Sequence, residues 1–211
     1  MTKVFYTTSW GQHDVIYTLD ELRPQLKKTS WKTDFPSDHC PASSAYWRDT
    51  YDLSVPFDLE FAFDPINQEI TTNNVPDFVY DQNSETTMWK DTNVEFQMLN
   101  NVHFWTNSKS DIFLEVFPSW YVNQLGLRGS VGKFNFVKWQ RPIHSSFQFY
   151  TDGVMDVVKI PADMPMTHVR FSKSVNLEFV DELPDNIVKQ TQRRSATLMM
   201  PQYLKKINPF K

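Results

Sequence analysis

The chain has 211 residues, of which 40% are hydrophobic and 15% aromatic, and it carries a formal net charge of −4. This length predicts one domain with its own core, and the acidic balance argues against nucleic acid as a partner. No apolar run approaches the roughly 18 residues of a membrane span. The polar start of the chain shows no secretory leader, which favours a protein made and kept in a cytoplasm.

The first 50 residues are expected to form an N-terminal extension of the domain. Within them, TLDELRPQLKK (18–28) fits a short helix interrupted at Pro24. Cys40 is the one cysteine, so no internal disulfide can form, which fits a reducing compartment. We interpret Cys40 as a small buried hydrophobe, with a nucleophilic or redox thiol as the alternative.

The strongest local pattern lies in LSVPFDLEFAF (53–63), where apolar side chains occupy every second position. A period of two over eleven residues predicts one long strand with one dry face. Pro56 cannot donate to a sheet ladder, so this strand is expected to lie at an edge or carry a bulge there. Asp58 and Glu60 point to the opposite face and are interpreted as solvated.

Similar short alternating segments follow along the chain, separated by turn residues. The segment 111–117 is expected to bury Ile112, Leu114 and Val116, or the opposite set. YTDGVM (150–155) predicts a hairpin turn, because Asp-Gly tolerates positive φ. Regularly spaced strands of this kind predict a mainly β domain, an antiparallel β-sandwich or jelly-roll-like barrel, with its β core over residues 51–182. The further predicted strands are 94–99, 133–139, 147–150, 154–160, 166–171 and 175–180.

Two other segments lack the strand period. Residues 65–92 are rich in Asn and Thr and are interpreted as a strand remnant followed by an excursion at one end of the sandwich. The last segment, 183–211, predicts a helix from about residue 186 with a tail, interrupted at Pro201 and preceded by Leu183 as a hydrophobic staple. This basic helix is expected to pack on its own domain, with docking on a partner as the alternative.

The five histidines are candidate metal ligands. No H-x-H, H-x-D or H-x-E spacing occurs, so neither the cupin pattern nor the usual iron triad is present. A site assembled from His103, His144 and His168 is the alternative to a protein with no metal and no cofactor. On MTHVRF (166–171), His168 shares a face with Arg170 and lies opposite Val169 and Phe171, so it is expected to face solvent or an adjoining surface.

No catalytic residue emerges from the remaining motifs. The chain lacks G-x-S-x-G, a Walker phosphate loop and C-x-x-C. GLRGSVGKF (126–134) has three glycines and a lysine, but its neighbours are predicted strands, so it is interpreted as a loop between strands.

Aromatic residues at predicted strand ends and loops suggest a binding face. Exposed rings on a β-sandwich stack on sugars or anchor a protein interface, although most such rings belong to a core. The candidates for this face are Trp89, Trp105, Trp120, Tyr121 and Trp139.

Three stretches also carry a resemblance: CPASSAYWRDTYDLSVPFDLEF (40–61), GKFNFVKWQRPI (132–143) and IPADMPMTHVRF (160–171). In this order they resemble a β-rich protein family of marine tailed phages, cyanophages especially, over roughly residues 39–180. The resemblance implies a phage origin but no catalytic residue, because no chemistry is assigned to these motifs. The last stretch is also similar to barrel strands of dUTPase-like folds, but Asp163 stands where their glycine would be.

The sequence therefore predicts a phage-encoded, non-enzymatic structural or interaction protein, as a virion component. Its partners would be other proteins of the virion or the host, with no nucleic acid and no membrane, in the host cytoplasm or the particle; an oligomer is compatible with the sequence. The alternatives are a cupin-like metal-dependent enzyme with dispersed ligands and a modulator that binds a host protein.

Overall fold

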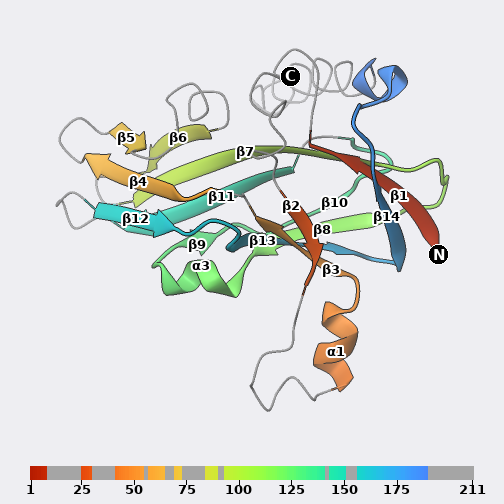
Figure 1. The fold of residues 1–211 in the computed structure, drawn as a ribbon, viewed down its shortest axis with the longest axis horizontal. Coiled ribbons are helices and arrows are strands. Elements are labelled where there is room, and N and C mark those ends of the chain that lie inside the picture. The colour runs from red at the N-terminus through yellow and green to blue at the C-terminus, as the bar shows by residue number, and fades with distance from the viewer. Residues whose placement is uncertain are drawn as a thin grey trace, which may run out of the picture.

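The computed structural model describes residues 1–8, 25–29, 41–54, 57–64, 69–72, 84–89, 93–140, 143–150 and 156–189. In this part of the chain the fold is mainly β, which confirms the predicted fold class (Figure 1). The helices are short: α1 (Pro41–Trp47), α3 (Trp120–Gln124) and residues 185–189. The described residues do not include Cys40, Trp10, Trp31 or the tail beyond residue 189. No helix in the described ranges is long and apolar enough to cross a bilayer.

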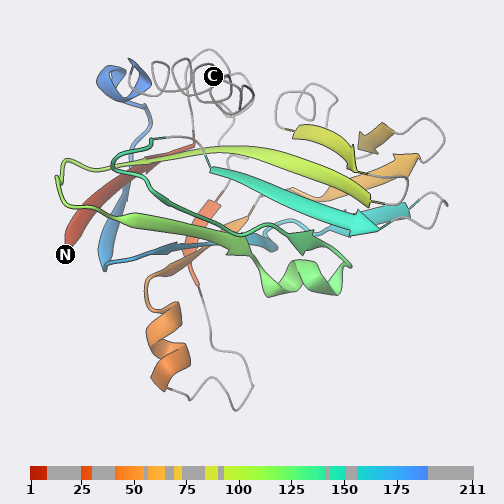
Figure 2. The same cartoon turned by 180° about the vertical axis from the view of Figure 1, so that it is seen from behind.

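Two sheets face each other across the core, and β7 and β11 lie over β8 and β13 in Figures 1 and 2. The six-stranded sheet contains β14 (Val175–Phe179), β1 (Thr2–Thr7), β7 (Asn93–Trp105), β11 (Ile143–Tyr150) and β9 (Arg128–Gly129), with β6 (Ser84–Trp89) also paired to β7. The five-stranded sheet contains β10 (Gly132–Asn135), β8 (Phe113–Pro118), β13 (Pro165–Phe171), β3 (Thr50–Ser54) and β2 (Gln25–Lys28).

A third sheet extends one end of the sandwich (Figure 1). It contains β12 (Asp156–Ile160), β4 (Leu59–Asp64) and β5 (Glu69–Thr72). The polar segment 65–92 thus contributes two strands, β5 beside β4 and β6 beside β7, where one strand remnant was predicted.

Two described segments of the first 50 residues, β1 and β2, are strands of the two main sheets. β1 lies between β14 and β7, in parallel with the first and antiparallel to the second, and its Val4 is fully buried. The helix predicted over 18–28 is wrong for its last four residues, which form β2 along β3. Leu26 packs against the core there, and this tertiary contact outweighs the local helical tendency.

The long strand predicted over 53–63 is two strands in two sheets. β3 ends at Ser54 and β4 begins at Leu59, on either side of Pro56. The expected burial holds for Leu53, Leu59 and Phe61. Leu53 of β3 and Leu59 and Phe61 of β4 all lie at odd-numbered positions. The period of two therefore continues across the break between the strands and does not reveal it.

Residues 151–155, where a hairpin turn is predicted, lie outside the described residues, but the strands on either side of them belong to different sheets. β11 pairs with β7 and β9, whereas β12 pairs with β4 in the third sheet. The chain therefore passes from one sheet to another between residues 150 and 156, because β12 finds its ladder partner in β4 and not in its sequence neighbour.

The core between the two main sheets is filled with aromatic and aliphatic side chains. Phe171 meets Phe104 and Phe136 edge to face, with ring centroids 5.4 and 5.8 Å apart. The first of the two alternatives for residues 111–117 is confirmed, because the set with Ile112 and Leu114 is the buried one. The buried core residues are Val4, Leu53, Val102, Phe104, Ile112, Leu114, Val116, Phe136, Ile143, Val169, Phe171 and Val175.

The predicted C-terminal helix begins at residue 185, and residues 185–189 are helical. The backbone amides of Ile187 and Val188 donate to the carbonyl of Pro184, which closes the first turn. Leu183 and Ile187 pack with Trp105 in a second, smaller core. The expected packing of this segment on its own domain is confirmed for these residues, and the rest of the predicted helix lies outside the described residues.

The glycine-rich stretch 126–134 is interpreted from its sequence as a loop between strands, but it contains β9 and the first residues of β10. Gly126 has φ = 75°, a conformation that strains residues with a Cβ. At Gly129 an added Cβ would overlap the ring of Pro118, so β9 can approach β8 this closely only with glycine.

Candidate functional site

The outer face of the five-stranded sheet, opposite the core, carries the polar and charged side chains of β13 and β8. Alternation along β13 sends Val169 and Phe171 inward and His168 and Arg170 outward. Helices α1 (Pro41–Trp47) and α3 (Trp120–Gln124) lie on this outer side, below the sheet in Figure 1. We call this region the outer face.

Both helices are held by local contacts that the sequence encodes. α1 starts with Pro41, which suits a first helical position because its missing amide would be unpaired there. The hydroxyl of Thr50 donates to the carbonyl of Tyr46, which ties the end of α1 to β3. Buried Ser119 caps α3, since its hydroxyl accepts from the amide of Tyr121 over 3.2 Å.

His168 is 1% exposed and pairs with a carboxylate on the neighbouring strand. Its Nδ1 lies 2.8 Å from Oδ1 of Asp52, its register partner on β3. The same oxygen accepts from the hydroxyl of Thr29 over 2.7 Å. Because a carboxylate only accepts, Nδ1 is the ring nitrogen that donates. The predicted facing of His168 is confirmed: it lies opposite the core, against an adjoining surface.

Aromatic rings from α1, α3 and β8 cover His168. The rings of Trp47, Phe117 and Trp120 have centroids 5.1, 5.2 and 4.8 Å from the imidazole. Trp47 and Trp120 also meet edge to face at 4.8 Å, so the two helices touch above the histidine. Nε2 is buried and has no hydrogen-bond partner among the described residues. This arrangement suits a structural histidine that joins sheet and helices.

Two residues farther along β13, on the same face, Arg170 is held on two sides. Its Nε donates to Glu115 over 3.1 Å, and its Nη2 pairs with the same carboxylate. The guanidinium carbon lies 3.7 Å from the centroid of the Tyr46 ring. Both side chains of the ion pair are about three-quarters buried, so the arginine is fixed by a charged partner and a ring face.

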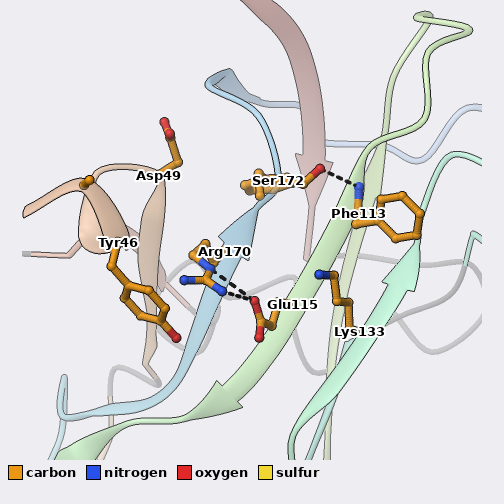
Figure 3. Close-up of a pocket in the computed structure, with 9 residues that line it drawn as sticks. Tyr46, Asp49, Phe113, Glu115, Lys133, Arg170 and Ser172 are labelled. Atoms are coloured by element: carbon orange, nitrogen blue, oxygen red, sulfur yellow. Dashed lines mark hydrogen bonds and ion pairs between the residues drawn. The ribbon is translucent and has the colours of Figure 1, made fainter. Parts of the chain in front are cut away.

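A pocket of about 260 Å³ opens between α1 and the outer face, with Arg170 at its centre (Figure 3). Lys133 of β10 and Ser172 line the side opposite α1, and in Figure 3 the Lys133 ammonium points toward the Arg170–Glu115 pair. The full lining is Ala45, Tyr46, Asp49, Phe113, Glu115, Lys133, Arg170, Phe171 and Ser172.

Two rings at the rim of this pocket are exposed. Tyr46 is 42% exposed and Phe113 is 41% exposed. The Lys133 ammonium lies 5.9 Å from the centroid of the Phe113 ring. Apolar surface of this kind beside charged groups remains in contact with water in the isolated chain, so its burial by a partner would be favourable.

The carboxylate of Asp49 belongs to the pocket wall but is engaged elsewhere. It accepts from the hydroxyl of Ser174 over 2.9 and 3.0 Å, and in Figure 3 it points away from Arg170.

On the inner side of the sheet, burial raises the pKa of Tyr51, and the charge of Asp49 raises this pKa further.

The residues of the metal alternative lie on different sheets. His103 on β7 is buried in the six-stranded sheet, while His168 is on β13 of the five-stranded sheet. His144 is on β11, but its side chain lies outside what the structure describes. Within the described residues, no group of three or more His, Cys, Asp or Glu side chains is placed to hold a metal ion.

The five aromatic candidates fall into separate contact groups. Trp105 is 5% exposed and stacks on Phe5 in the small core, so its ring is not part of an exposed face. Trp120 and Tyr121 are neighbours on α3, with centroids 5.6 Å apart. Trp139 is 41% exposed and meets Phe134. Trp89 is on β6, and its side chain lies outside the described residues.

Sequence reasoning did not identify the residues that line the pocket. Arg170 is mentioned only as a neighbour of His168, and Lys133 only as the lysine of the glycine-rich stretch interpreted as a loop, whereas no role is predicted for Tyr46 and Glu115. A usable signal was present in alternation, because it places Arg170 and Glu115 outward on adjacent strands as an opposite-charge pair. The contribution of Tyr46 depends on the position of α1 and has no sequence signal.

No protein-family model and no curated protein matches this chain. Among solved structures, the chain is similar to native EIAV dUTPase at 13% identity and a TM-score of 0.34, over 78% of this chain and 98% of that chain. A likeness of this degree carries no argument about what this chain does.

Proposed function

We propose that this chain is a non-enzymatic structural or interaction protein that contacts another protein through the pocket between α1 and the outer face. The supporting observation is Arg170, held by Glu115 on one side and by the ring of Tyr46 on the other. An arginine fixed in advance loses little conformational freedom on binding. Arginine and tyrosine are also enriched among the residues that dominate binding energy.

The surroundings of Arg170 support the same proposal. Charged groups at the pocket centre are bordered by the exposed rings of Tyr46 and Phe113. The pocket is smaller than the roughly 300–1,000 Å³ typical of sites that enclose a drug-sized molecule. It suits the insertion of one or two side chains from a protein surface.

The proposed setting is a phage particle, on the resemblance of the three stretches to a protein family of marine tailed phages. In this setting the chain is a virion component of jelly-roll-like architecture, in one or several copies, present in the particle or in the host cytoplasm. This part of the proposal rests on sequence resemblance and on the frequent use of such sandwiches in virus particles.

Quantitative mass spectrometry of purified particles of the encoding phage tests the setting. The expected result is this chain at a fixed number of copies per particle. Its absence from particles, together with recovery on a host protein from infected cells, would replace the virion role with that of a host-binding modulator. Stoichiometric iron or zinc in the purified protein, lost on His168→Ala, would overturn the proposal in favour of a metal-dependent enzyme.

Site-directed photo-cross-linking tests the binding surface. A p-benzoylphenylalanine in place of Phe113 is expected to cross-link the full chain to a defined protein in particles or infected cells. The matched control carries the same group in place of Phe179, which is 40% exposed on β14, at the edge of the other main sheet. Equal cross-linking from both positions would contradict a role for the pocket.

A further inference from the structure

Strand β14 forms one edge of the six-stranded sheet, at the end of the molecule opposite the third sheet (Figures 1 and 2). Within the described residues it pairs with β1 and with no other strand. The amide of Val180 donates to the carbonyl of Tyr6 on β1. Because alternate residues of a strand bond to the same neighbour, the backbone groups of Val175 and Leu177 face away from β1. These groups can form a ladder with a further strand.

The other edges of the sheets are better protected against such pairing. Among the edge strands of at least four residues whose side chains are described, β2, β10 and β12 each carry exposed lysine: Lys27 and Lys28, Lys133, and Lys159. An exposed lysine on an edge strand disfavours pairing with another chain. β14 has no lysine, and its one charged side chain, Glu178, forms an ion pair with Lys3 of β1. It also carries Phe179, whose ring is 40% exposed.

From this we infer that β14 pairs with β14 of a second copy of this chain, antiparallel about a twofold axis at Leu177. The sequence VNLEF complements itself in this register. On the inner face, Leu177 lies opposite Leu177 of the second copy, and Val175 lies opposite Phe179. On the outer face Asn176 lies opposite Glu178, so an amide donor meets a carboxylate acceptor.

This register is better than its neighbour and covers exposed apolar surface. A shift by one residue toward the C-terminus would place Glu178 opposite Glu178, and like charges directly opposite each other are destabilising. The register centred on Leu177 avoids this and pairs all five residues of β14. It also covers the ring of Phe179, which meets Tyr6 at 5.4 Å, with Val175 of the second copy. This self-complementarity favours a second copy over a strand of another protein.

The inference goes beyond the proposed function and does not depend on it. The pocket lies on the outer face of the five-stranded sheet, whereas β14 belongs to the six-stranded sheet. A pair of five-residue strands offers less contact area than the roughly 1,200 Å² of a standard stable interface. We therefore expect a dimer that forms reversibly and depends on protein concentration.

Sedimentation velocity of the full chain, from low micromolar to millimolar concentration, tests the dimer. The expected result is a shift from monomer to dimer as the concentration rises. Phe179→Lys places a lysine on the edge and is expected to keep the chain monomeric throughout. The matched control is Val157→Lys, at a 47% exposed valine on the edge strand β12, and it should dimerise like the unmodified chain.

A second variant tests the register through charge. Asn176→Glu places glutamate opposite Glu178 of the second copy, and the twofold axis creates two such like-charge pairs. The expected result is a dimer about tenfold weaker than that of the unmodified chain. Asn176 is exposed and lies beside Lys3 in the ladder with β1, so this substitution does not threaten folding.

Photo-cross-linking of the purified chain locates the contact. With p-benzoylphenylalanine in place of Phe179, the cross-link is expected at Val175 of a second copy, as mapped by mass spectrometry. This product has twice the mass of the chain, which distinguishes it from a cross-link to another protein formed at position 113.

The remaining outcomes overturn the inference. A chain that stays monomeric at every concentration has no such dimer. A dimer that persists in both Phe179→Lys and Asn176→Glu, or that is lost equally in Val157→Lys, does not form through β14. A monomeric chain that cross-links from position 179 to a different protein assigns this edge to a strand of that protein. None of these results changes the outcome of cross-linking from position 113, which tests the proposed function separately.

Discussion

The two faces of the five-stranded sheet bury their side chains through different interactions. Facing the six-stranded sheet, β13 places Val169 and Phe171 in a core of apolar side chains. On the outer face the same strand places His168 and Arg170, each with a carboxylate partner and each against aromatic rings. Successive residues of β13 therefore belong alternately to an apolar layer and to a charged layer.

The difference shows what each kind of layer requires. Apolar side chains need only close packing, and the edge-to-face contacts of Phe171 supply it. A buried imidazole also needs a hydrogen-bond partner, and a buried guanidinium needs a partner of opposite charge, because an unpaired buried polar group is unfavourable. The outer face is therefore more sensitive to the loss of one specific partner, and the inner face to the loss of volume.

Truncation in the inner layer should have the largest effect on stability. Phe171→Ala removes a buried ring that touches Phe104, Phe136 and Tyr51. The expected loss in the free energy of unfolding is about 3–5 kcal/mol, from lost burial and the cavity left behind. Urea denaturation measures it. Phe179→Ala, at an exposed ring, is the control, and an equal loss in both would contradict the assignment of Phe171 to the core.

Removal of the partner of His168 should have the next largest effect. Asp52→Ala leaves the buried Nδ1 and the Thr29 hydroxyl without their acceptor. The expected loss is about 1.5–3 kcal/mol in the free energy of unfolding, as for a hydrogen bond with a charged partner. Asp52→Asn retains an acceptor oxygen and should lose clearly less. If the two variants are equally destabilised, the hydrogen bonds of Asp52 do not account for its contribution.

The smallest expected effect is a decrease in stability at alkaline pH. It depends on two partly buried tyrosines, Tyr6 and Tyr51, that pack against the core. Burial raises the pKa of Tyr6 and of Tyr51, and Asp49 adds to the effect at Tyr51. Above about pH 10 the unfolded chain therefore loses these protons before the folded chain does. The folded state then binds more protons, so stability falls as pH rises.

The measurement is the free energy of unfolding in urea at a series of alkaline pH values. The double variant Tyr6→Phe/Tyr51→Phe lacks both phenols and should show a shallower decline above about pH 10 than the unmodified chain. Parallel declines in the two proteins would show that other groups control alkaline stability.

Much of the strand framework could be predicted from alternation, since most strands downstream of residue 93 lie close to their expected positions. The breaks could not be predicted: β3 and β4 share one parity across Pro56, and β11 and β12 belong to different sheets. Strand pairing depends on which distant segment is available, and a local pattern does not contain that information. The same limit explains why β2 was mistaken for part of a helix.

By itself the sequence determined which side of β13 each residue faces, because the backbone of a strand alternates whatever its neighbours are. Only the tertiary structure decided that the polar side would be covered, that His168 would meet Asp52, and that Arg170 would lie between Glu115 and Tyr46 at a pocket. These contacts join segments more than 50 residues apart in the chain, as for Arg170 and Glu115 at a separation of 55. Their formation depends on the relative placement of sheet and helices, which the packing of the whole domain sets.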